Sequence, residues 1–316
     1  MKKTIALALA AIMCLGVFTG CSKKDEEVSY WDTYKSTFSE GLATLNPYTL
    51  GGTSDYGFVA NILDGLVEAD HYGRYVPALA ESWEANDDFT VWTFHLRKGQ
   101  YWIDSTGAKT EWEITSQNFV DSMRYIADPA NGVNNFSTIR GVIAGLYDYY
   151  YLLADIDDGI VTDKKREDVV AAFGELVGVK AVDDYTLEYT LDGPVPYFLS
   201  YTEIELMLPL EQRFLDKVGE DFGTSKENML YCGGYYISTW DRDKLLVLTK
   251  NENNWDKDNL TLKALSFEAV GDGISGVELF KRGQIATTKL SSEELSSVKS
   301  SDYGDYVYLS EKTLST

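Results

Sequence analysis

Several side chains and motifs on which enzymes commonly depend are scarce or missing in this chain of 316 residues. It has two histidines, His71 and His95, and none of the motifs HExxH, CxxC, GxxxxGKS/T or GxSxG. Those motifs are typical of zinc proteases, dithiol redox enzymes, P-loop nucleotide hydrolases and α/β-hydrolases. The acidic pairs Asp87-Asp88 and Asp157-Asp158 lack the spacing of a calcium loop. The sequence therefore predicts a protein that is not an enzyme, with no metal site and no cofactor.

Cysteine is also rare, with three residues in the chain, Cys14, Cys21 and Cys232. If Cys14 leaves with a cleaved leader and Cys21 carries a lipid, Cys232 has no intramolecular partner, and a disulfide framework is excluded. An exported protein without disulfides has to rely on the size of its hydrophobic core. The composition allows such a core, because 44% of the residues are hydrophobic and 13% are aromatic. A chain of this length predicts more than one domain.

Positively charged residues are scarce. The chain has 28 Lys and Arg and 50 Asp and Glu, for a formal net charge of −22. Loss of Lys2 and Lys3 with a leader would bring this to about −24. Such an excess of negative charge argues against nucleic acid or an anionic lipid surface as a partner. It says little about a small ligand, since an excess of one charge is usually a solvated surface.

The N-terminus has the pattern of an export signal. Lys2 and Lys3 precede an apolar run of about 14 residues, 5–18, which is shorter than the roughly 20 residues of a membrane-spanning helix. Phe18-Thr19-Gly20-Cys21 resembles a bacterial lipobox, although an aliphatic residue is more usual than Phe18. We therefore predict a signal peptide at 1–20, lipid attachment at Cys21 and a polar tether at 21–27, which would anchor the protein to the outer face of the cell membrane. The alternative is a secreted protein in which Cys21 occurs by chance.

Hydrophobic spacing predicts a mixed α/β chain. Alternation of apolar and polar residues predicts strands at 28–38, 90–96, 184–191, 245–249 and 262–270. A helical spacing predicts helices at 55–66, 114–126 and 164–176, and Pro at its start favours a short helical turn at 77–83. Thr115 is the expected N-cap of the helix at 114–126.

The stretch 77–102, PALAESWEANDDFTVWTFHLRKGQYW, resembles the signature of the solute-binding proteins of peptide-type ABC importers, extracytoplasmic family 5. Further segments of the chain follow the same family pattern in order. They are Leu45-Asn46-Pro47, ILDGLVEAD at 62–70, Asp128-Pro129, PVPYF at 194–198 and MLYCGGYYISTW at 229–240. The resemblance covers about 45–316, which corresponds to the N-terminal half of the family fold.

This resemblance implies a fold class: an α/β protein of two lobes, like the periplasmic binding proteins, with an extra domain inserted into the first lobe. It assigns 28–61 and 184–285 to the first lobe and 62–183 to the inserted α/β domain. Residues 286–316 would begin a second lobe, truncated at the end of this sequence. Trp92 and Phe94 would then belong to the scaffold of the inserted domain rather than to a binding site.

The resemblance also implies a function: capture of a peptide, expected to be an oligopeptide, outside the membrane and its delivery to ABC permease subunits by a monomeric protein. Two adjacent glycines allow a ligand to approach the backbone closely. In the family, the segment that contains them here lines the ligand cleft. The loop before GYYISTW supplies backbone groups there. The expected ligand-binding residues are Gly51, Gly52, Thr53, Phe136, Tyr231, Cys232 and Gly233.

Two other interpretations remain open at this point. A binding protein of the same family could take a dipeptide, nickel, haem or a glycan, and a secreted hydrolase would need two carboxylates that face a cleft.

The pattern GxGxxG of dinucleotide-binding proteins occurs after a predicted strand, at Gly271-Asp272-Gly273-Ile274-Ser275-Gly276. We disfavour that match, because an export signal precedes it and its strand does not open a βαβ unit.

Overall fold

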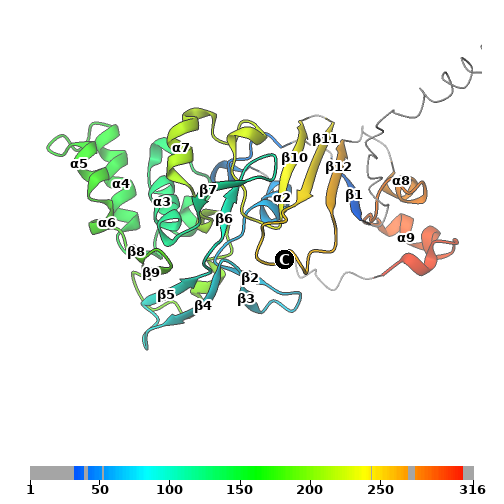
Figure 1. Cartoon of the computed structure of the whole chain (residues 1–316), viewed down its shortest axis with the longest axis horizontal. Helices are drawn as coiled ribbons and strands as arrows, with labels where there is room; N and C mark the ends of the chain where they lie inside the picture. The colour runs from blue at the N-terminus through cyan, green and yellow to red at the C-terminus, as the bar shows by residue number, and fades with distance from the viewer. Residues whose placement is uncertain (1–31, 39–41, 52, 243, 270–274, 309–316) are drawn as a thin grey trace, which may run out of the picture.

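The computed structural model describes residues 32–38, 42–51, 53–242, 244–269 and 275–308. Within these ranges two four-stranded β-sheets and two short hairpins are surrounded by helices. The chain is elongated, with α4 (Leu146–Asp157) and α9 (Ser292–Lys299) near opposite ends (Figure 1). The predicted leader, Cys21 and the tether lie outside the described residues. Within the described ranges no helix is long and apolar enough to cross a membrane.

The first sheet has the strand order β1-β12-β11-β10. β1 (Thr33–Phe38) pairs in parallel with β12 (Ala264–Ala269), and β12, β11 (Leu245–Lys250) and β10 (Tyr235–Asp241) are antiparallel neighbours. The strands predicted at 245–249 and 262–270 are confirmed, and the strand predicted at 28–38 is confirmed over its described part. This sheet therefore joins the beginning of the described chain to its later third.

α2 (Thr53–Ile62) lies against the first sheet, where the Phe58 ring meets the Phe267 ring edge-on at 4.8 Å between centroids. A 3₁₀ turn, Pro47–Thr49, precedes it, and the Asn46 side chain caps this turn by accepting the Tyr48 N–H at 3.0 Å. The predicted helix at 55–66 is thus confirmed as an element, although it ends at Ile62.

The second sheet has the order β4-β5-β9-β8 and is antiparallel throughout. It comprises β4 (Ala80–Ala85), β5 (Val91–Leu96), β8 (Val179–Asp183) and β9 (Thr186–Thr190). β5 is the predicted strand, and its inward-facing side chains are buried as a period of two requires. These are Trp92, Phe94 and Leu96.

The helical turn predicted at 77–83 is wrong. Pro77 is the last residue of β3 (Tyr75–Pro77), and Trp83 in β4 lies opposite Phe94 in β5. Ala, Leu and Glu in this segment favour a helix locally. Pairing of the β4 backbone with β5 and burial of its Ala80 override that preference, because strand formation depends on cross-strand neighbours that local spacing does not reveal.

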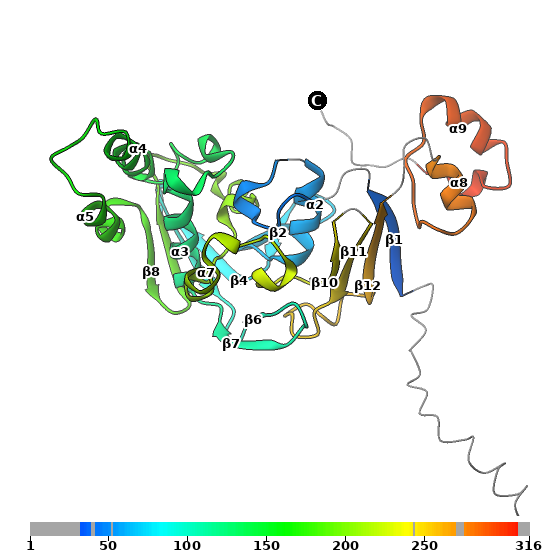
Figure 2. The same cartoon turned by 90° about the horizontal axis from the view of Figure 1, so that it is seen from above.

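The remaining elements surround the two sheets (Figures 1 and 2). β2 (Val67–Ala69) pairs with β3, and β6 (Tyr101–Ile103) pairs with β7 (Lys109–Glu113). α3 (Ser116–Ile126) begins after Thr115, whose N–H donates to Asn118 Oδ1 at 2.9 Å, so the predicted helix and its N-cap position are confirmed. The helix predicted at 164–176 is divided at Ala172. The remaining helices are α5 (Arg166–Ala171), α6 (Phe173–Leu176), α7 (Gln212–Val218) and α8 (Gly276–Lys281).

The predicted boundary at residue 184 falls between β8 and β9. These strands are hydrogen-bonded neighbours, so residues 186–190 share a sheet with strands of the predicted inserted domain. β10, β11 and β12 of the first sheet all follow this boundary. The division into lobes stays a prediction, with β9 on the side of the inserted domain.

Candidate functional site

The predicted ligand loop at 51–53 is held by the loop that precedes Phe136. Asn134 donates its N–H to the Tyr48 carbonyl at 2.9 Å. Its Nδ2 donates to the carbonyls of Thr49 and Leu50, both at 3.0 Å. Gly51 is exposed, and a Cβ added there would have no neighbour within 4 Å. Gly52 and the Thr53 side chain lie outside the described residues. The Gly51 backbone is therefore accessible at the end of an anchored segment.

Asn135 continues this connection to α2 and to the chain after β9. Its Nδ2 donates to the Tyr56 hydroxyl at 2.8 Å and to Glu205 Oε1 at 3.3 Å. Its φ of 60° lies in the left-handed region, which Asn adopts more readily than most residues. Phe136 itself is buried and stacks on Tyr150, with 4.1 Å between ring centroids. The structure thus brings the Gly51 and Phe136 segments together. The polar residues before Phe136 form the contacts between them, and the Phe136 ring packs in the core.

A hollow of about 360 Å³ begins at Tyr56 and runs along α2; we name it the acidic groove. Residues of α2 and β2 line it, together with Glu203, Glu205 and Leu208. Figure 2 shows where α2 and β2 lie in the fold. Part of its lining is apolar: Val59, Ala60, Leu63, Val67, Ala69 and Leu208. The titratable lining residues are Tyr56, Asp64, Glu68, Glu203 and Glu205, with no lysine, arginine or histidine among the lining residues.

Asp64 is the most deeply buried acid of the groove, with 6% of its surface exposed. Its Oδ2 accepts hydrogen bonds from Asn254 Nδ2 and Trp255 Nε1, each at 2.9 Å. The Arg97 guanidinium stacks over the Trp255 ring at 4.2 Å. Burial, and next the charge of Glu68, raise the pKa of Asp64 to about 7, against the opposing effect of the two hydrogen bonds. Near neutral pH this carboxyl therefore exists in both protonation states.

Two further groove acids, Glu68 and Glu203, also have raised pKa values. Burial, and next the charge of Asp256, raise the pKa of Glu68. Partial burial raises the pKa of Glu203, although the residue as a whole is exposed. Several carboxylates in one hollow without a balancing cation make the hollow a site of negative potential, which attracts positive charge.

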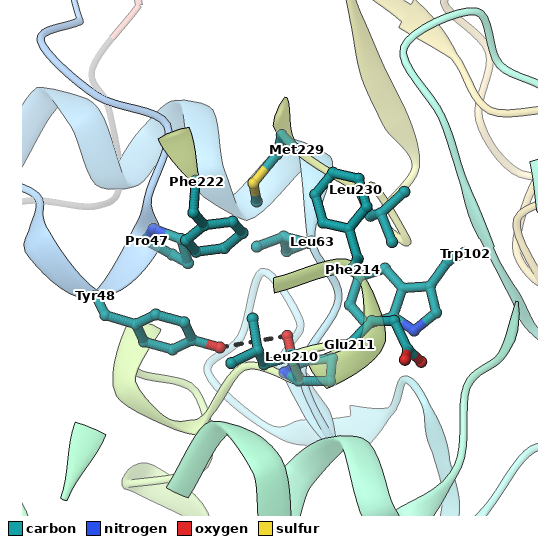
Figure 3. Close-up of a pocket in the computed structure, with 11 residues that line it drawn as sticks. Pro47, Tyr48, Leu63, Trp102, Leu210, Glu211, Phe214, Phe222, Met229 and Leu230 are labelled. Atoms are coloured by element: carbon teal, nitrogen blue, oxygen red, sulfur yellow. Dashed lines mark hydrogen bonds between the residues drawn. The ribbon is translucent and has the colours of Figure 1, made fainter. Parts of the chain in front are cut away.

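A second, much smaller cavity lies in the core beside the groove (Figure 3). Its volume of about 10 Å³ is close to that of one water molecule. Leu63 lines both hollows, and the Tyr48 hydroxyl donates to the Pro209 carbonyl at 3.3 Å along its wall. The labelled side chains of Figure 3 converge on this space from several elements, and most of them are apolar. This cavity is a packing gap of the core and is too small for a peptide.

Tyr231, Cys232 and Gly233 lie at the opposite end of α2 from the ligand loop. All three are buried. The N–H groups of Cys232 and Gly233 both donate to the Ile62 carbonyl, and Tyr231 exchanges backbone hydrogen bonds with Ile103. A helix of ten residues is about 15 Å long, so the structure does not bring these residues together with Gly51. Their N–H groups are all engaged within the chain, and their contact with a ligand stays a prediction.

Sequence reasoning missed the groove acids and the Asn135 connection. Asp64 occurred only within a family motif at the end of a helix. Glu203 and Glu205 follow the PVPYF turn with no recognisable pattern. The available signal was the isolated acid in the apolar run ILDGLV, because a carboxylate among hydrophobic residues needs a partner or a function. Among the described residues, no group of three or more His, Cys, Asp or Glu is arranged to hold a metal ion.

Comparison with known proteins identifies the family. The model described as "Bacterial extracellular solute-binding proteins, family 5 Middle" matches residues 74–315, which is most of the chain. The chain belongs to this family. Among curated relatives, the oligopeptide-binding protein AliA of Streptococcus pneumoniae is 29% identical over 92% of this chain and 42% of its own length. AmiA of the same species, also an oligopeptide-binding protein, is 31% identical over 84% of this chain and 38% of its own length.

Solved structures confirm the predicted fold class of this family 5 chain. OppA of Listeria monocytogenes, described as bound to peptide, superimposes with a TM-score of 0.69 at 27% identity, over 86% of this chain and 49% of OppA. OppA of Haemophilus influenzae, described as a complex with RPPGFSPFR, gives 0.69 at 26% identity, over 85% and 48%. The chain thus spans about half the length of the relatives that it matches.

Proposed function

We propose that this chain forms the substrate-binding component of an ABC importer, or part of it, and captures oligopeptides outside the membrane. The observation that carries the proposal is the family match over residues 74–315. Relatives of the same fold are described as oligopeptide-binding proteins or as complexes with peptide. This match favours binding over hydrolysis, so we propose no catalytic role for the groove carboxylates.

The proposed ligand site is the Gly51 loop together with the adjoining acidic groove. The loop offers backbone groups at an exposed glycine, and the hydrogen bonds of Asn134 fix its position. A fixed loop loses little conformational entropy when a ligand binds. In the proposed mechanism a second lobe would close over the peptide, and the closed form would be recognised by the permease subunits.

We further propose export and lipid attachment at Cys21. The support is the sequence alone: a basic start, a short apolar run and a lipobox-like site. Expression in a bacterial host with an alkyne analogue of palmitate should label the protein and place it in the membrane fraction. A Cys21→Ser variant should lose the label and leave that fraction; a labelled variant would contradict attachment at Cys21.

Calorimetric titration of the purified chain tests the proposed ligand class. Short peptides of mixed sequence should bind, whereas glycans, Ni²⁺ and haem should give no heat beyond dilution. Analysis of the recovered peptides should show no cleavage. Binding of one of the other ligands without any peptide would contradict the proposal.

A further inference from the structure

The acidic groove combines an apolar wall with carboxyl groups, of which that of Asp64 is the most deeply buried. Val59, Leu63 and Leu208 contribute to the wall, and Asp64 lies beside them with 6% of its surface exposed. A hollow of about 360 Å³ has room for a long side chain. Carboxylates without a balancing cation are costly in such a place, because burial disfavours their charged form.

Asp64 has one carboxyl oxygen that the described part of the chain does not use. Both of its side-chain hydrogen bonds are accepted by Oδ2, from Asn254 and Trp255. No donor among the described residues forms a hydrogen bond to Oδ1, although the residue is more than nine-tenths buried and lines the groove. The hydrogen bonds to Oδ2 fix the orientation of the carboxyl group. A donor that enters the groove therefore meets an acceptor that is already oriented.

We propose that the acidic groove binds the cationic side chain of a lysine or arginine in a peptide ligand. The methylene stem would lie on the apolar wall, and the ammonium or guanidinium group would reach the carboxyl of Asp64, near Glu68 and Glu203. This inference rests on the proposed function and adds a preference for basic peptides to it.

Two observations favour a basic side chain over other cations. The groove acids do not form a group that could hold a metal ion. An apolar wall that leads to a carboxylate matches a side chain with an aliphatic stem and a charged tip, whereas an N-terminal amine has no such stem. The groove also begins at Tyr56, whose hydroxyl is joined through Asn135 to the segment that holds Gly51. A peptide at the loop would thus have the groove within reach of a side chain.

The test compares three peptides that differ at one position: Ala-Ala-Lys-Ala-Ala and the same peptide with norleucine or glutamate in place of lysine. Each is titrated into the purified chain by calorimetry, with free and with acetylated N-termini. The lysine peptide should bind about ten- to hundredfold more tightly than the norleucine peptide, as expected for a hydrogen bond to a charged buried group. The glutamate peptide should bind most weakly. The lysine preference should persist after acetylation.

Three variants test which residues cause the preference for the lysine peptide. Asp64→Asn should reduce the ratio of the lysine and norleucine affinities at least about tenfold. Glu203→Gln, at an exposed residue, should reduce the ratio less and provides a variant with little risk to folding. Glu175→Gln removes the same charge from an exposed residue of α6, outside the groove, and should leave the ratio unchanged.

The outcomes separate the two proposals. If no peptide binds, the proposed function and the groove assignment both fail for this chain. If all peptides bind equally, or if acetylation removes the preference, peptide binding stands and the groove assignment is overturned. A lysine preference that is equal in the wild type, Asp64→Asn and Glu203→Gln would also overturn it.

Discussion

Asp64→Asn should stabilise the protein above neutral pH, and the gain should disappear in acid. Asn has nearly the same shape as Asp and keeps an oxygen that can accept the hydrogen bonds of Asn254 Nδ2 and Trp255 Nε1. Its amide NH₂ group would take the place of Oδ1. The substitution therefore removes a buried charge and retains the contacts that orient the side chain.

The magnitude follows from the pKa of Asp64, which burial raises from 3.8 to about 7. Because the pKa is higher in the folded than in the unfolded state, Asp64 favours folding while it is protonated in both states. This contribution is full below about pH 4 and is lost as the pH rises towards about 7. A pKa difference of about 3 corresponds to about 4 kcal/mol. Asn carries no such penalty.

Urea unfolding followed by tryptophan fluorescence measures this difference. Near pH 4, the difference between the free energies of unfolding of the wild type and Asp64→Asn should not change with pH. The variant should then gain up to about 4 kcal/mol as the pH reaches about 8. Glu68, Asp256 and Cys232, the other titratable groups around Asp64, remain in both proteins, so their own titration largely cancels.

Asp64→Ala is the matched control. It removes the charge but leaves Asn254 and Trp255 without their shared acceptor, at a cost of about 1–3 kcal/mol for each unsatisfied buried group. It should therefore be less stable than Asp64→Asn at every pH. Parallel pH profiles of the wild type and Asp64→Asn would refute the reasoning, because they would show that Asp64 titrates alike in the folded and unfolded states.

Four further substitutions test the fold and the ligand loop. Phe94→Ala, at a fully buried ring, should cost about 3–5 kcal/mol of stability in urea unfolding and leave peptide affinity unchanged. Gly233→Ala should cost about 3 kcal/mol, because its Cβ would lie 2.6–2.7 Å from backbone atoms at Asn61, Ile62 and Leu63. Gly57→Ala, on an open face of α2, should add about 0.5–1 kcal/mol. Asn134→Ala should cost about 1–2 kcal/mol and weaken peptide binding, since the Gly51 segment loses two hydrogen bonds.

Each of these has a result that would contradict it. Loss of peptide affinity in Phe94→Ala with stability intact would place the ring in the binding site instead of the scaffold. A stable Gly233→Ala would show that the backbone crossing at Ile62 is looser than described, and a destabilised Gly57→Ala would show that α2 is not open at this position. Unchanged affinity in Asn134→Ala would separate the Gly51 loop from the ligand.

The sequence predicted the elements whose signal is local. β5 alternates half-buried and buried residues within its own six positions, and Thr115 marks the start of α3 by its side-chain type. β4 was mistaken for a helix because its structure comes from pairing with β5, which local spacing does not show. The groove could not be predicted for the same reason. Asp64, Glu68 and Glu203 meet only after α2, β2 and the chain beyond β9 have been brought together by tertiary packing.

The stability and binding experiments both test the charge of Asp64: one measures its effect on unfolding and the other its effect on peptide affinity. As an ion, the Asp64 carboxylate costs stability in the free protein, and Asn could make both of its hydrogen bonds without that cost. The property that Asp has and Asn lacks is a negative charge with an unused oxygen in the groove. Such a charge is expected in a binding site. It is unfavourable in the free protein, and a bound cation offsets the free-energy cost of burying the carboxylate. Asp64→Asn should therefore gain stability and lose lysine preference together. If it gained stability and kept the preference, the buried charge would have no role in the groove.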